Sequence, residues 1–104
     1  MDLSFTYIIN DIPYLLKKVD KSTCFVNLNT QKPEYRLHSD MKFRYMKNDI
    51  VVITRMRHRF FFIKKASEYI AAYRILDLHH PVLSTKAVYN SCAESGDDLI
   101  IFTN

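Results

Sequence analysis

Apolar residues recur along the whole chain in short runs separated by polar residues. Of all the features of the sequence, this distribution restricts the possible folds most. Runs such as residues 50–53 and 60–63 are far shorter than the roughly 20 residues that span a bilayer. With 104 residues, 48% of them hydrophobic, the chain can build one modest core and is too short for two. We therefore expect a soluble, folded, single domain that covers residues 1–104.

The N-terminus lacks the basic start and the continuous apolar stretch of a secretory signal peptide, so we expect a cytoplasmic or nuclear location and no secretion. Cys24 and Cys92 lie far apart and outside any Cys-x-x-Cys pair, which predicts two buried thiols and no disulfide. The abundance of Tyr, Phe, Ile, Asn and Lys suggests an AT-rich coding sequence of viral or phage type. In that case the protein would act inside a host cell.

Three segments have patterns typical of helices. In residues 11–21, apolar residues fall at i, i+3, i+4 and i+7, the Asn-Asp pair at the start can cap exposed amides, and lysines gather toward the end. Residues 66–78 repeat apolar side chains at helical spacing and contain three alanines, although a pair of strands remains an alternative. Residues 84–95 suit a short helix that ends at Gly96.

Segments rich in β-branched and aromatic residues predict strands. These strands are residues 4–9, 23–29, 35–38, 42–46, 49–55, 59–64 and 99–102. We expect a turn at Lys47-Asn48, a hairpin bend near Arg57-His58, and a central strand covered on both faces at the C-terminus. The predicted fold is α+β: a mixed or mostly antiparallel sheet, able to curl into a partial barrel, with two or three short helices.

Positive charge is concentrated in residues 42–65. This segment holds eight of the fifteen basic residues and one of the eleven acidic residues, a net charge of +7, whereas the rest of the chain carries −3. In a strand, Arg55, Arg57 and Arg59 would point to one face about 7 Å apart, which is similar to the spacing of phosphates along a single strand. Arginine forks suit phosphate, and neighbouring aromatic rings can stack on unpaired bases.

This segment predicts a non-enzymatic binding protein that contacts nucleic acid or another polyanion. The predicted contact residues are basic or aromatic: Lys42, Arg44, Tyr45, Arg55, Arg57, Arg59, Phe60 and Lys64. Two alternatives stay open. The segment can be a solvated sheet face whose arginines are neutralised by acids of the same chain. The protein can also be an interaction module, such as a viral antagonist of a host protein or a homodimer, because Tyr, Phe, Met and Arg are enriched at interfaces. No membrane contact is expected.

Residues 48–53 followed by residues 60–63 form a predicted strand pair of a recognisable kind. The pair resembles one found in small barrel modules that read RNA or modified DNA, the PUA-like and EVE-like group. Those modules usually have a glycine in the turn before the first of these strands, and this chain has none there. The resemblance implies a barrel-like sheet that binds nucleic acid.

Signatures of catalysis are weak. The chain has one glycine, which excludes phosphate-binding loops that need several. Asp77, His79 and His80 could hold a metal or serve acid–base chemistry, but a helix end before Pro81 explains them better, and no further ligand at useful spacing accompanies them. The adjacent residues 38–40 have the side chains of a nucleophilic triad but cannot converge as one. We expect no cofactor or metal, and a hydrolase that uses His79 or His80 is a third hypothesis.

Overall fold

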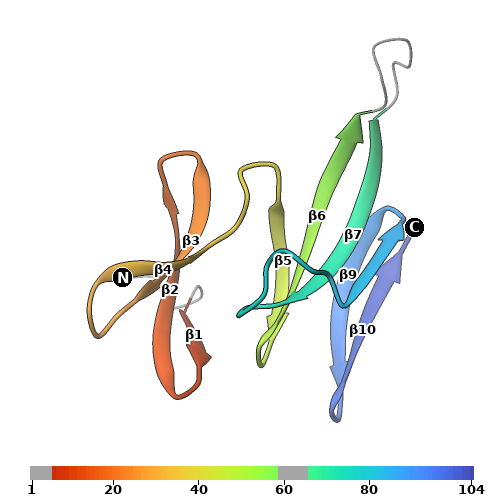
Figure 1. Cartoon of the computed structure of the whole chain (residues 1–104). Coiled ribbons are helices and arrows are strands. Elements are labelled where there is room, and N and C mark those ends of the chain that lie inside the picture. The colour runs from red at the N-terminus through yellow and green to blue at the C-terminus, as the bar shows by residue number, and fades with distance from the viewer. Residues whose placement is uncertain (1–5, 59–65) are drawn as a thin grey trace. The chain divides into compact units, whose positions relative to one another are not determined.

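Every regular element in the described part of the chain is a β-strand (Figure 1). The computed structural model describes residues 6–58 and 66–104, and no helix occurs in these residues. The ten strands are β1 (Thr6–Ile9), β2 (Ile12–Val19), β3 (Ser22–Asn27), β4 (Lys32–Arg36), β5 (Lys42–Lys47), β6 (Ile50–His58), β7 (Ala66–Arg74), β8 (Leu83–Lys86), β9 (Tyr89–Ser95) and β10 (Asp98–Thr103). The prediction of an α+β fold with two or three helices is therefore wrong. Within the described residues, no helix has the length and apolar character needed to cross a membrane.

The chain divides into two compact units, Met1–Ser39 and Asp40–Asn104. The first unit contains one antiparallel sheet in the order β1-β2-β3-β4. The second contains an antiparallel sheet in the order β5-β6-β7-β8 and the hairpin of β9 and β10. Each strand thus pairs with a neighbour in sequence, so each unit is a meander of hairpins. That the chain is one domain stays a prediction.

The segment 11–21, predicted to be a helix, forms β2 instead. Asn10 and Asp11 have positive φ angles of 51° and 65° and form a two-residue turn between the paired residues Ile9 and Ile12. A type I′ hairpin turn requires positive φ at both central residues, and Asn and Asp tolerate this conformation better than most residues. Asn and Asp are also common helix caps, so the Asn-Asp pair is compatible with a helix start as well as with a hairpin turn.

A polar cluster joins three strands of the first unit. The hydroxyl of Tyr14 donates to Glu34 Oε1 at 2.8 Å, and Asn27 Nδ2 donates to Glu34 Oε2 at 2.7 Å. Asn27 Oδ1 accepts hydrogen bonds from the backbone amides of Asn29 and Thr30 at 2.8 and 3.2 Å. Burial, together with the hydrogen bond to Glu34, raises the pKa of Tyr14. The cluster ties the β3–β4 turn to the buried face of the sheet.

The segment 66–78, for which a helix was predicted and strands were the alternative, contains β7. Its nine residues pair with β6 without interruption, from His58 with Ala66 to Ile50 with Arg74. The strand is apolar on both faces because both are buried: residues 70–73 are at most 5% exposed. The predicted hairpin bend near Arg57-His58 is wrong, since both residues lie in β6 and pair with β7. The strand predicted at residues 59–64 lies outside the described residues.

The segment 84–95 is also not a helix. It is divided between β8 and β9, and Gly96 lies in the turn between β9 and β10 with a φ of 60°. The strand predicted at residues 99–102 is confirmed as part of β10, but it is not covered on both faces. Ile100 and Phe102 are 40% and 48% exposed, and among the described strands β10 pairs only with β9.

The strands predicted at residues 42–46 and 49–55 are confirmed as β5 and β6, with the turn one residue later than expected, at Asn48-Asp49. Three buried residues of β6 and β7, Val52, Ile70 and Ala72, form the centre of a core cluster in the second unit. Partly buried side chains that pack against this cluster are Tyr45, Ile50, Ala87, Tyr89, Cys92, Leu99 and Ile101. The β9–β10 hairpin therefore covers one face of the larger sheet.

Candidate nucleic-acid interface

The predicted contact residue Arg44, on β5, is engaged within the second unit. Its Nε donates to the hydroxyl of Thr54 at 2.9 Å, and its Nη2 lies 3.7 Å from Glu68 Oε1. The guanidinium carbon lies 5.2 Å from the centre of the Tyr89 ring, within cation–π range. Burial and a hydrogen bond with Cys92 raise the pKa of Tyr89 to about 12. Arg44 thus links β5, β6, β7 and β9.

The other two predicted contact residues on β5 differ from each other. Tyr45 is partly buried and packs against the core cluster of the second unit. Lys42, at the start of the strand, is exposed. Of the three, Lys42 has the position that a surface contact with a polyanion requires.

Arg55, on β6, forms an ion pair with Asp40. Its Nε and Nη2 both donate to Asp40 Oδ2, at 3.2 and 2.6 Å. The hydrogen bonds that Arg55 donates to Asp40 raise the pKa of Arg55. Side-chain exposures of 34% for Arg55 and 42% for Asp40 leave both groups in reach of solvent. The pair therefore presents hydrogen-bonding groups at the surface, and its own net charge is small because the two charges are opposite.

The remaining predicted contact residues lie at or beyond the end of β6. Arg57 is in the strand, opposite Ser67, and the pairing of β6 with β7 has no bulge between positions 55 and 57. The period of two that the sequence analysis assumed therefore holds as far as the described strand extends. Arg59, Phe60 and Lys64 lie outside the described residues.

Neutralisation by acids of the same chain accounts for part of the basic segment. Besides Arg44 and Arg55, Lys47 is engaged: its Nζ donates to the backbone oxygen of Gly96 at 2.6 Å and lies 3.8 Å from Glu94 Oε1. These contacts attach β5 to the β9–β10 hairpin. Sequence reasoning did not find them because each joins residues that are far apart in the chain.

A hollow with a volume of about 470 Å³ opens beside the Arg55–Asp40 pair in the second unit. Its floor is the sheet face that carries Ala71 of β7 and, as the paired residue on the next strand, Ser84 of β8. Its lining residues include Asp40, Arg55, Tyr69, Ala71, Tyr73 and Ser84, with Met56 and Pro81 completing the set. Sequence reasoning missed the two tyrosines as site residues because it placed them on a helix. The alternation of Tyr69, Ala71 and Tyr73 along a strand is the signal that could have found them.

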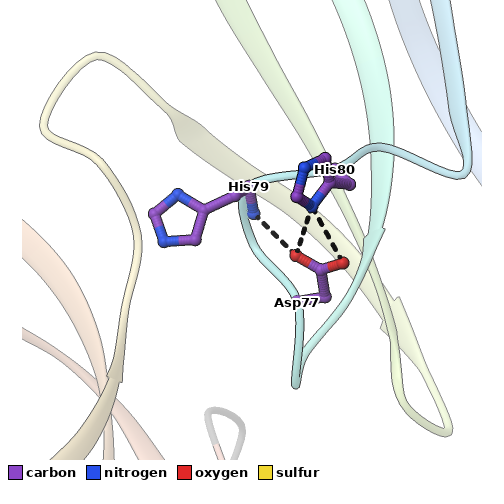
Figure 2. Close-up of polar contacts among 3 residues, drawn as sticks. All are labelled: Asp77, His79 and His80. Atoms are coloured by element: carbon purple, nitrogen blue, oxygen red, sulfur yellow. Dashed lines mark hydrogen bonds and ion pairs between the residues drawn. The ribbon is translucent and has the colours of Figure 1, made fainter.

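The predicted Asp–His cluster forms a turn on the surface of the second unit (Figure 2). Asp77 Oδ1 accepts a hydrogen bond from the backbone amide of His79 at 3.3 Å, and His80 Nδ1 lies 3.1 and 3.2 Å from the two carboxylate oxygens. The bond with His80 lowers the pKa of Asp77. The ring of His79 points away from Asp77, and the side chain of His80 is 84% exposed. Across the residues that the structure describes, no three His, Cys, Asp or Glu side chains gather as a metal site would need.

The segments that resemble the RNA- and DNA-reading barrel modules are only partly described. Residues 48–53 form the turn after β5 and the first part of β6, and residues 60–63 lie outside the described residues. Comparison with protein-family models, with curated proteins and with solved structures finds no match to the chain.

Proposed function

We propose that the protein binds nucleic acid, or another polyanion, through basic residues of its second unit. The observation that carries the proposal is the net charge of +7 on residues 42–65. Within this segment, residues 59–65 alone contribute three basic residues, four apolar residues and no acid.

The contact residues of the proposal differ in what they contribute. The charged contacts are Lys42, Arg57, Arg59 and Lys64, with Phe60 available to stack on a base. Arg55 is paired with Asp40, so its contribution is directional hydrogen bonding. Arg44 and Tyr45 support the interface indirectly by holding β5 in the sheet. Arg44 does so through its hydrogen bond to Thr54, and Tyr45 does so by packing against the core cluster.

The test is a fluorescence anisotropy titration with labelled single-stranded DNA and RNA of mixed sequence, at low and at physiological salt. Binding should weaken steeply with salt, because each neutralised phosphate releases counterions. The double variant Arg59→Gln, Lys64→Gln should bind at least tenfold more weakly than the natural chain.

The matched control is the double variant Lys18→Gln, Lys32→Gln, which replaces two exposed lysines of the first unit. It lowers the net charge by the same amount as Arg59→Gln with Lys64→Gln. This variant should bind nearly as well as the natural chain. No binding of the natural chain to either polymer at low salt, or equal losses in both double variants, would exclude the proposed interface.

A second candidate function, association with a second copy of the chain, is favoured by β10. Ile100 and Phe102 are exposed on its outward face, and the strand has one charged residue, Asp98, at its start. Antiparallel pairing of two β10 strands about Ile101 would place Ile100 beside Phe102 of the second copy and keep the two Asp98 carboxylates at opposite ends. The exposed apolar edge and this separation of like charges suit a symmetric dimer.

Sedimentation velocity over a range of protein concentrations tests this candidate. The natural chain should show a monomer–dimer equilibrium, and Phe102→Lys should be monomeric throughout. Val82→Lys, which charges another exposed apolar position, should leave the equilibrium unchanged. A natural chain that is monomeric at every concentration removes this candidate.

A further inference from the structure

We propose that the hollow beside Arg55 binds one flat, uncharged heteroaromatic ring whose edge carries both hydrogen-bond donors and acceptors, as a nucleobase does. The inference rests on the proposed function, since it makes the hollow the pocket for one unpaired base of a bound single strand. It adds a base-reading site to the basic residues and the stacking ring of the proposed interface.

The shape of the hollow follows from the alternation of side chains along β7. Residues two apart on a strand share a face, so Tyr69, Ala71 and Tyr73 lie in one row. The alanine between two tyrosines leaves space above the sheet, and Ser84 opposite it on β8 is also small. A volume of about 470 Å³ lies within the range of about 300–1,000 Å³ that is usual for small-molecule pockets. Aromatic walls around a small floor suit a flat ring.

The polar groups at the hollow favour an uncharged ring over an anion. Arg55 and Asp40 both line it, and their opposite charges largely cancel at a separation of 2.6 Å. A guanidinium supplies donors and a carboxylate supplies acceptors, so the pair matches a ligand edge that has both. A phosphate placed there would meet the Asp40 carboxylate as well as the arginine.

The pair is also held in position before any ligand arrives. Arg55 is fixed by two hydrogen bonds to Asp40 Oδ2, and the buried residue Tyr73 lines the hollow beside the pair. Donors that are already oriented lose little freedom on binding, which is the condition for specificity in a small site.

The experiment is an NMR titration of the full chain with adenosine, guanosine, cytidine and uridine, each separately, and with inorganic phosphate. We expect saturable shifts of the backbone amides around Ala71 and Ser84 with at least one nucleoside and no saturable shift of these amides with phosphate. Saturation by phosphate but by no nucleoside would overturn the inference and identify an anion site. The absence of saturation by any of the five probes would also overturn it.

Ser84→Phe fills the hollow from an exposed strand position, and Thr85→Phe adds the same ring one residue later, on the opposite face of β8. Ser84→Phe should weaken nucleoside binding at least tenfold, and Thr85→Phe should not change it. Equal effects of the two variants contradict the location. If Ser84→Phe fails to fold, Tyr69→Leu replaces it: loss of the aromatic wall should weaken binding, and unchanged binding contradicts the inference.

The outcomes separate this inference from the proposed function. Nucleosides that saturate the hollow in a chain that binds no oligonucleotide would leave a small-ring site and remove the polyanion interface. Oligonucleotide binding that Arg59→Gln with Lys64→Gln weakens, without any response of the hollow to nucleosides, would keep the interface and remove the base pocket.

Discussion

Asn27 shows at the level of one residue how a buried polar side chain determines local structure. Only 5% of the residue is exposed, and its amide makes hydrogen bonds from both ends, to Glu34 and to the amides of the β3–β4 turn. The sequence places Asn27 in a strand but contains no sign that Glu34 is its partner. The partner depends on how the chain turns after β3.

Replacement of Asn27 by alanine should destabilise the protein. Asn27→Ala removes the hydrogen bond to Glu34 and those from the two turn amides, and each lost hydrogen bond costs about 0.5–1.5 kcal/mol of unfolding free energy. Urea denaturation followed by circular dichroism measures the change. Asn29→Ala, at an exposed position of the same turn, is the control, and a loss no larger than that of the control contradicts the role assigned to Asn27.

A second prediction at this scale concerns the pKa of Asp77. Its pKa is lowered chiefly by the bond with His80, so the interaction stabilises the fold at pH values above the carboxyl's unfolded pKa and is lost as the pH falls through its folded pKa. In His80→Ala the pKa of Asp77 should rise toward its ordinary value, as measured by carboxyl-carbon NMR. His79→Ala keeps the backbone amide that Asp77 accepts from and should change this pKa much less. Similar shifts in the two variants would contradict the assigned cause.

At the scale of elements, β2 and β7 show why periodicity alone predicted helices. Ile12 and Leu16 are four residues apart, and a spacing of four places two residues on one face in a helix and equally in a strand. In β7 the apolar residues occupy both faces, because both faces are buried. The strands β6 and β8 pair with its two edges. Only the pairing with neighbouring strands distinguishes the two structures.

The turn before β2 gives a prediction whose sign separates a strand from a helix. Asp11→Gly should stabilise the protein by about 0.5–1 kcal/mol, because glycine adopts the positive φ of the second turn position without steric cost and Asn-Gly is a favoured type I′ pair. At the start of a helix, the same change would remove a favourable carboxylate and destabilise the protein. Thermal unfolding decides between them. Asp11→Val, which places a β-branched residue at positive φ, should destabilise the protein and serves as the opposite control.

At the scale of the whole molecule, the charge asymmetry of the sequence is partly used inside the fold. Among the described basic residues of the segment, Arg44, Lys47 and Arg55 contact groups of their own unit and support the structure. The proposed interface therefore depends on the other basic residues of the segment, chiefly Lys42, Arg57, Arg59 and Lys64.

The salt dependence of binding measures how many of these residues contact phosphate. Each phosphate contact that is removed should reduce the slope of log K against log salt concentration by about 0.7 for a single-stranded polymer. We expect this reduction for Arg59→Gln and no reduction for Lys32→Gln, an exposed position of the first unit. Anisotropy titrations at several salt concentrations give both slopes. Equal slopes for the two variants would show that Arg59 makes no phosphate contact.

The amino-acid sequence was sufficient for local features of this protein. β-branched and aromatic residues marked β5, β6 and β10, and Asn48 marked a turn, because strand propensity and tolerance of positive φ belong to single residues. Three features arose only on folding. They are the strands that flank the Asn10-Asp11 turn, the neutralisation of Arg55 by Asp40, and the hollow between two tyrosines. Each depends on the register between strands, and a slip of one residue would turn every side chain of a strand to the opposite face.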